Sequence, residues 1–426
     1  MNRTFLMIRS AGFAFVTKLS GAATVFVALP LVARGVSPAD YATFLTTMNV
    51  AAIGGLVFAP YAALFIRELA HAFARDDDKA LRLAVRACFG AHAALVALVG
   101  AGFVAIGAAL AFGSTLKLAM AVGVALNLLQ VAASFGQLYR IAERTDHVTS
   151  LVQTAANLVL VGALLALAHF GRLNDLSVCL VYFGVPALAE LAVFTQVFRA
   201  RALPLRIGRR AFADLRERIP ESLPLYLSPV ADYVKVYGAA MLALLVASKH
   251  DYIVFSTAAL MIARLVNPLT LVTRPLMPAF IDAFQRGDEA WLGGLRRALF
   301  GGALVGALAA AALPFVVSRE VFAYALPKEA RDISTAFIVF CAFFAYSYAL
   351  TALLAPLYIG ARRAPFYGIA NLAFTLAGAG LGAVAATRFG AAGMMSCLAV
   401  ATTACGVLLL AAMDWRGAAR APPSSS

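Results

Sequence analysis

Long apolar runs dominate this chain from one end to the other. An α-helix needs roughly 20 consecutive apolar residues to cross a bilayer, and it satisfies all of its backbone hydrogen bonds internally. Runs of this length recur at residues 11–33, 42–66, 87–112, 116–139, 149–170 and 176–198, and again at 223–247, 251–274, 298–318, 333–358, 366–387 and 391–413. The sequence therefore predicts an all-α polytopic membrane protein with about twelve transmembrane helices.

The composition leaves little room for a soluble catalytic domain. Hydrophobic residues make up 62% of the 426 residues and charged residues 13%, whereas soluble domains are about 45–50% apolar and about 25% charged. No nucleotide-binding GxxxxGK[ST], HExxH or GxSxG motif occurs. The five cysteines form no CxxC pair and lie in or beside apolar runs, which favours packing over metal binding. We therefore expect a protein that is not an enzyme, with no catalytic residues, no metal and no cofactor.

The net charge of +14 has a topological explanation. In a membrane protein such an excess follows the positive-inside rule, so nucleic acid is not the expected partner. Connections on one side carry a roughly threefold excess of lysine and arginine over the other side, which places both termini in the cytoplasm. The basic segment 67–86 either lies along the anionic inner leaflet or forms a solvated connection.

Two halves of the chain resemble each other. Asp40-Tyr41-x-x-Phe44 recurs as Asp251-Tyr252-x-x-Phe255, and "AFARDD" at 72–77 recurs as "AFQRGD" at 283–288 with the same offset of 211. The pattern predicts a parallel repeat of two six-helix lobes, which is typical of transporters that alternate access. The expected domains are an N-terminal lobe over 1–198, a basic cytoplasmic linker over 199–222, a C-terminal lobe over 223–413 and a disordered cytoplasmic tail over 414–426.

Three basic residues lie inside predicted spans: Lys18, Lys235 and Arg264. A charge at the centre of a bilayer costs about 2.5–3.5 kcal/mol on insertion scales, so such residues usually face a cavity or a partner. One interpretation is a cationic cavity that attracts an anion, with Arg264 gripping a phosphate. The other is structural, with an internal pair between Asp232 and Lys235, which share a helix face, and Lys18 reaching the membrane surface.

Polar residues within the spans supply further candidates. Asn49 and Asn267 are predicted to join the basic residues in binding substrate, although hydrogen bonds between helices also explain such side chains. Asp232 and Glu190 are candidates for a coupled ion or proton. Pro268, Pro275 and Pro278 predict a bend or break in the helix beside Arg264.

The segment "KLSGAATVFVALPLVARGVSPADYATFLTTMNV" at 18–50, with the basic "RELAHAFARDD" at 67–77, resembles the opening of the Wzx-type polysaccharide-transporter flippases. These belong to the multidrug/oligosaccharidyl-lipid/polysaccharide (MOP) exporter superfamily. The resemblance implies a V-shaped helical bundle in a bacterial inner membrane, with a central cationic cavity. Its implied cargo is an undecaprenyl-pyrophosphate-linked oligosaccharide, and Lys18, Lys235 and Arg264 fall where such proteins place cavity cations.

The expected function is therefore flipping of a lipid-linked oligosaccharide to the periplasmic leaflet for O-antigen, capsule or exopolysaccharide assembly. Expected partners are the lipid-linked cargo, membrane lipids, and a polysaccharide polymerase with its chain-length regulator. Two alternatives remain open. One is a cation-coupled multidrug or small-molecule exporter of the same fold, and the other is a non-transporting scaffold of a polysaccharide assembly complex.

Overall fold

The computed structural model describes residues 3–74, 78–111, 118–143, 145–201, 226–266, 286–316, 324–361 and 363–413, with residues 217, 280 and 283. The chain divides into two compact units, Met1–Pro229 and Val230–Ser426. Most of the expected linker at 199–222 and the whole expected tail at 414–426 lie outside the described residues, so both stay predictions.

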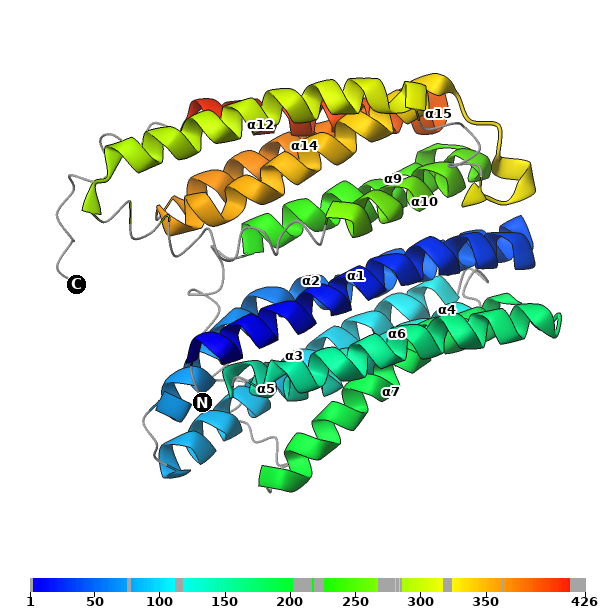
Figure 1. Cartoon of the computed structure of the whole chain (residues 1–426). Coiled ribbons are helices and arrows are strands. Elements are labelled where there is room, and N and C mark those ends of the chain that lie inside the picture. Colours follow the sequence, from blue (N-terminus) through cyan, green and yellow to red (C-terminus); the bar gives the residue numbers. More distant parts are fainter. Residues whose placement is uncertain are drawn as a thin grey trace. The chain divides into compact units, whose positions relative to one another are not determined.

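The first unit consists of long helices that follow one another along the chain (Figure 1). They are α1 (Arg3–Gly35), α2 (Pro38–Ala74), α3 (Asp78–Ala111), α4 (Leu118–Ala133), α5 (Phe135–Ala142), α6 (Asp146–His169) and α7 (Asp175–Arg201). In the second unit, residues 226–233 are helical. They are followed by the π-helix η1 (Val234–Gly238), then α9 (Ala239–Val246), α10 (Lys249–Val266), α12 (Glu289–Val316), the short η3 (Lys328–Ala330), α14 (Thr335–Gly360) and α15 (Ala364–Ala411).

Ten helical stretches among the described residues are long and apolar enough to cross a membrane. Two further considerations raise the number of possible membrane spans from ten to twelve. First, α15 contains two legs joined at Gly390, whose φ of 55° and ψ of −140° interrupt the helix. Second, α10 occupies a predicted span but is shorter and more polar than the others. The predicted all-α polytopic fold is confirmed.

The two legs of α15 pack closely because glycines line their contact. A Cβ atom on Gly382 would lie 2.7 Å from the Met394 sulfur, and one on Gly393 would lie 2.6 Å from the Ala385 carbonyl oxygen. Small residues let membrane helices approach in this way. The sharp reversal at Gly390 needs a positive φ, which glycine adopts without strain.

The connection predicted at 67–86 is instead mostly helical. Residues 67–74 continue α2 and residues 78–86 begin α3, leaving only 75–77 between the two helices. With 37 residues, α2 is about 55 Å long, which exceeds the roughly 30 Å hydrocarbon core. The segment is therefore helical on both sides of residues 75–77, and the choice between contact with the inner leaflet and a solvated connection stays open.

The repeated Asp-Tyr-x-x-Phe motif has a structural role in each unit. The Asp40 backbone N–H donates to Ser37 Oγ at 3.2 Å, and the Asp251 N–H donates to Ser248 Oγ at 3.1 Å. Each serine thus caps the helix that follows it, and its hydroxyl donates to the carboxylate of the same aspartate. The matching tyrosines and phenylalanines are fully buried in both copies: Tyr41, Phe44, Tyr252 and Phe255.

The fourth predicted span, 116–139, is not one straight helix. It is interrupted at Ser134, between α4 and α5. The buried His92 of α3 fills the break, with its Nε2 3.0 Å from the Val131 carbonyl oxygen and 3.2 Å from that of Ala132. The ring nitrogen facing two acceptors must be the donor. His92 therefore satisfies carbonyl groups that the interruption removes from the regular helical pattern.

Candidate functional site

The second unit encloses a lysine within its first membrane-spanning segment. Lys235 lies in η1, and its side chain is 0% exposed. A π-helical turn fits one residue more than an α-turn, and such turns occur frequently at functional sites. The desolvation of an ammonium group is expensive, so the surrounding groups must compensate the charge.

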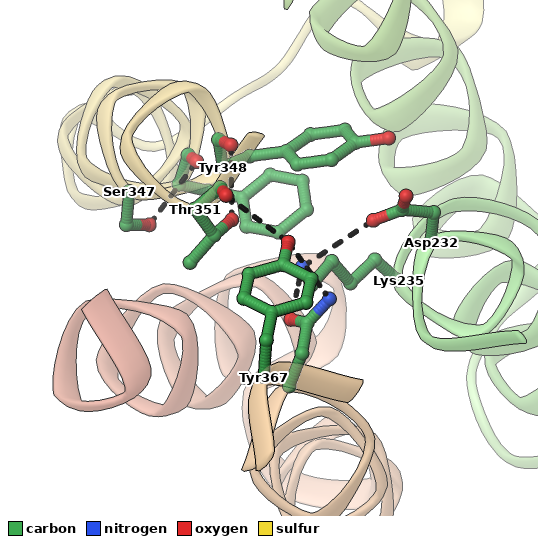
Figure 2. Close-up of polar contacts among 8 residues, drawn as sticks. Asp232, Lys235, Ser347, Tyr348, Thr351 and Tyr367 are labelled. Carbon is green, nitrogen blue, oxygen red and sulfur yellow. Dashed lines mark hydrogen bonds and ion pairs between the residues drawn. The ribbon is translucent and has the colours of Figure 1, made fainter. Parts of the chain in front are cut away.

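Three groups surround the Lys235 ammonium. Its Nζ donates a 2.7 Å hydrogen bond to Asn371 Oδ1, lies 3.5 Å from Asp232 Oδ1, and sits 5.0 Å from the centre of the Tyr348 ring. Figure 2 shows the lysine between Asp232, from its own helix, and side chains that come from α14 and α15. A carboxylate, an amide oxygen and an aromatic face are all favourable neighbours for a cation.

The amide that holds Lys235 is itself oriented by a second layer of hydrogen bonds. Asn371 Nδ2 donates to the Tyr367 hydroxyl at 3.5 Å, and that hydroxyl donates to the Thr351 carbonyl oxygen at 3.0 Å. The network therefore joins η1, α15 and α14 inside the second unit (Figure 2). Because each step fixes the next, the position of the ammonium depends on how these three elements pack.

Asp232 is partly exposed, whereas its ion-pair partner Lys235 is fully buried. The Asp232 side chain is 41% exposed. Ionisable groups within a membrane span face water-filled space or a partner rather than lipid. Arg264 of α10 is half-buried. The second unit thus contains Asp232, Lys235 and Arg264, with Lys235 in contact with both Asp232 and Tyr348.

This cluster can exchange counter-ions. While Asp232 is ionised, it compensates Lys235, and the ammonium is shielded from an external anion. A proton or a cation on the accessible carboxylate would remove that compensation, and the buried ammonium would then favour a new anionic partner. The arrangement suits a charge switch better than a permanently open anion site.

The first unit holds Lys18 in α1, beside a polar seam with α6. Thr17 Oγ1 donates to the Ser150 carbonyl oxygen at 2.9 Å, and Asn157 Nδ2 donates to Ser20 Oγ at 2.9 Å. Lys18 itself is half-buried. The seam explains how α1 and α6 associate within an apolar medium, because hydrogen bonds join membrane helices.

Glu190 of α7 is a buried acid with one hydrogen-bond partner. Gln153 Nε2 donates to its Oε1 at 2.8 Å, while Oε2 is buried and has no hydrogen-bond partner among the described residues. The residue is 4% exposed. An ionised carboxylate in such surroundings is costly without a counter-charge, so Glu190 has the surroundings of a carboxyl group that favours its protonated form.

Two predicted substrate-binding residues, Asn49 and Asn267, remain to be located. Asn49 of α2 is fully buried inside the first unit, and Asn267 lies outside the described residues. The part that sequence reasoning missed is the enclosure of Lys235 by Tyr348, Tyr367 and Asn371. One available signal was the spacing of Tyr367 and Asn371, which are four residues apart and therefore share a helix face.

Metal-binding chemistry has no obvious location in the part of the chain that the structure describes. No three histidine, cysteine, aspartate or glutamate side chains gather there in a way that could hold an ion. The five cysteines are free thiols, four of them buried.

The helices and their internal charges define a multi-pass membrane protein, and comparison with solved structures defines its fold. Neither a protein-family model nor a curated protein sequence matches the chain. Lipid II flippase MurJ in an inward closed conformation matches with a TM-score of 0.69 and 11% identity, over 93% of this chain and 86% of MurJ.

Two further transporters have similar folds. The eukaryotic MATE transporter AtDTX14 gives a TM-score of 0.60 at 14% identity, over 98% of this chain and 97% of that one. A MOP superfamily transporter from Pyrococcus furiosus gives 0.60 at 14% identity, over 95% and 94%. This chain therefore has the fold of the MOP superfamily transporters, although identities this low define the fold alone.

Proposed function

We propose that this protein is a flippase for an oligosaccharide linked to undecaprenyl pyrophosphate. It would move this lipid from the cytoplasmic to the periplasmic leaflet of a bacterial inner membrane, with both of its own termini in the cytoplasm. The cargo would feed the assembly of a surface polysaccharide, beside a polymerase and a chain-length regulator. The fold supports this proposal because it is shared with a lipid flippase and with exporters.

The observation that carries the proposal is the enclosed ammonium of Lys235, in the same unit as the half-buried Arg264. Basic residues inside membrane spans are costly and usually serve a pathway or a partner. A pyrophosphate is an anion that suits an ammonium and a guanidinium together. Lys18 of the first unit and Asn267 are further candidates for contact with the cargo, whereas Asn49 is fully buried and would act only through the packing of the first unit.

In this mechanism Asp232 acts as the competitor of the cargo. It holds Lys235 when no cargo is present, and a coupled proton or cation on its accessible carboxylate releases the lysine for the pyrophosphate. Glu190 is a second position for a coupled ion, in the first unit. Alternating access would then follow from the change of partner, since each arrangement stabilises a different packing of the helices around Lys235.

A second candidate is a cation-coupled exporter of small molecules. The observation that favours it is the accessibility of Asp232 beside a fully enclosed Lys235, because this arrangement presents a carboxylate rather than a cation. Such a surface suits a positively charged compound. The two candidates differ in the sign of the cargo, which an experiment can determine.

The test begins with a deletion strain. If the flippase proposal holds, lipid-linked oligosaccharide accumulates in the inner membrane while surface polysaccharide disappears. Complementation with Lys235→Ala or Arg264→Ala should then restore much less polymer than Lys249→Ala, which removes an exposed charge at the start of α10. Normal polysaccharide together with increased sensitivity to cationic drugs would overturn the flippase proposal in favour of the exporter. Equal complementation by all three variants would exclude the proposed cargo site and favour a scaffold.

A further inference from the structure

A basic face occurs at the start of α3, just before its apolar part. Lys79, Arg82, Leu83 and Arg86 are spaced by three and four residues, so they share one side of the helix. All four are exposed, and the Leu83 side chain is 58% exposed. Neither Arg82 nor Arg86 forms an ion pair with another described residue. We call these four residues the α3 basic face.

The position of this face along the helix places it at a membrane boundary. Val104 follows Arg86 by 18 residues, which is five turns, so both lie on the same side of α3. Val104 is apolar and 72% exposed, as expected for a side chain in contact with lipid. The two residues are about 27 Å apart along the axis, close to the roughly 30 Å thickness of the hydrocarbon core. When Val104 lies near one edge of the core, Arg86 lies near the other, at the level of the lipid phosphates.

The chemistry of the face fits a lipid headgroup. Each guanidinium offers a planar pair of donors that matches a phosphate. An exposed leucine between basic residues suits the boundary between headgroups and acyl chains, where basic amphipathic helices bury their apolar side.

The internal repeat shows that this face is not a general requirement of the fold. At the offset of 211, α3 and α12 begin at equivalent residues, Asp78 and Glu289. The positions that match the α3 basic face are Ala290, Gly293, Gly294 and Arg297. Three of these four residues, the alanine and the two glycines, are small and uncharged. In addition, Arg297 Nε donates to the Gly293 carbonyl oxygen of its own helix at 3.4 Å.

We propose that the α3 basic face is a binding site for the phosphate groups of anionic lipids, such as phosphatidylglycerol. The site belongs to the first unit and is independent of the transported cargo. Because each basic residue near an anionic surface contributes about 1 kcal/mol, loss of both arginines should weaken binding roughly thirtyfold.

The test uses the purified full-length protein in a neutral detergent, with phosphatidylglycerol or phosphatidylcholine added to the micelles. A lipid that binds the folded state raises the unfolding midpoint. Phosphatidylglycerol should stabilise the wild type more than phosphatidylcholine does, and native mass spectrometry should show retained phosphatidylglycerol. Arg82→Gln/Arg86→Gln should lose most of both effects.

Three controls separate this site from general attraction. Arg82→Lys/Arg86→Lys keeps the charge and should retain most of the stabilisation. Arg297→Gln removes one arginine at the matching position of α12 and should leave it unchanged. Inorganic phosphate at equal ionic strength should not replace the lipid. The proposal is overturned if the double glutamine variant binds phosphatidylglycerol like the wild type, if Arg297→Gln weakens binding equally, or if inorganic phosphate stabilises the protein as well as the lipid does.

Discussion

Removal of the Asp232 carboxylate should destabilise the second unit, because Lys235 would keep its charge without its counter-ion. Removing one partner of a fully buried ion pair costs about 3–5 kcal/mol. The Asp232 side chain is 41% exposed, and Asn371 and Tyr348 still hold the ammonium in the variant. Solvent screening and these remaining contacts reduce the cost, so we expect Asp232→Ala to lower the free energy of unfolding by about 2 kcal/mol.

Removal of the cation tests the same pair from the other side. In Lys235→Met an unbranched apolar chain fills much of the space, but Asn371 Oδ1 loses its 2.7 Å donor. Leaving that acceptor unsatisfied should cost about 1–3 kcal/mol. In the double variant Asp232→Ala/Lys235→Met no charge is left uncompensated. Its cost should therefore be near that of Lys235→Met alone, which corresponds to a coupling energy of about 2 kcal/mol.

Thermal unfolding of the purified protein in detergent measures these differences. For a unit of this size, 1 kcal/mol moves the midpoint by about 2–4 °C, so Asp232→Ala should unfold roughly 4–8 °C below the wild type. Asp332→Ala is the matched control, because it removes an exposed aspartate of the same unit and should change stability by less than about 0.5 kcal/mol. A coupling energy below about 0.5 kcal/mol, or equal shifts in the two aspartate variants, would refute the reasoning.

Three further predictions concern helix ends and buried polar groups. Asp251 takes part in the cap of α10 and also accepts a 2.8 Å hydrogen bond from the Ala391 N–H, so Asp251→Ala should cost about 2 kcal/mol in denaturation experiments. A loss below about 0.5 kcal/mol would exclude a contribution from the bond to Ala391. Glu190→Gln should keep stability within about 1 kcal/mol, because an amide replaces an acid with one partner; a loss above 3 kcal/mol would indicate an ionised, compensated glutamate. His92→Phe should cost about 1–3 kcal/mol, because the Ala132 carbonyl loses the His92 Nε2 donor, while the Val131 carbonyl still accepts from Ser134. Amide hydrogen exchange should increase around Ser134, and unchanged exchange there would contradict the role of His92 at the break.

Much of the fold could be predicted from the sequence because it depends on local patterns. Apolar runs of sufficient length require helices in a membrane, so the helices were found, and the face shared by Asp232 and Lys235 led to the ion pair observed at 3.5 Å. The enclosure of Lys235 could not be predicted. Asn371 and Tyr348 lie more than 100 residues further along the chain, and their approach depends on how α14 and α15 pack. The π-turn and the break filled by His92 are likewise products of tertiary packing, for which short apolar sequences carry no distinct signal.

At matching positions of the two repeats, the capping and aromatic residues are the same, but an acidic residue near the shared lysine differs. This difference distinguishes residues that the helical repeat needs from residues that it does not need. The capping serines, aspartates, tyrosines and phenylalanines occur in both copies because each unit needs the same helix start. Lys18 matches Lys235 at an offset of 217, but the residue that matches Asp232 is Phe15, so an acidic residue three positions before the lysine is found in the second copy and not in the first. A feature that the fold required would be expected in both units. An aspartate three residues before the lysine occurs at only one of the two matching positions, so the helical repeat itself does not require this acid.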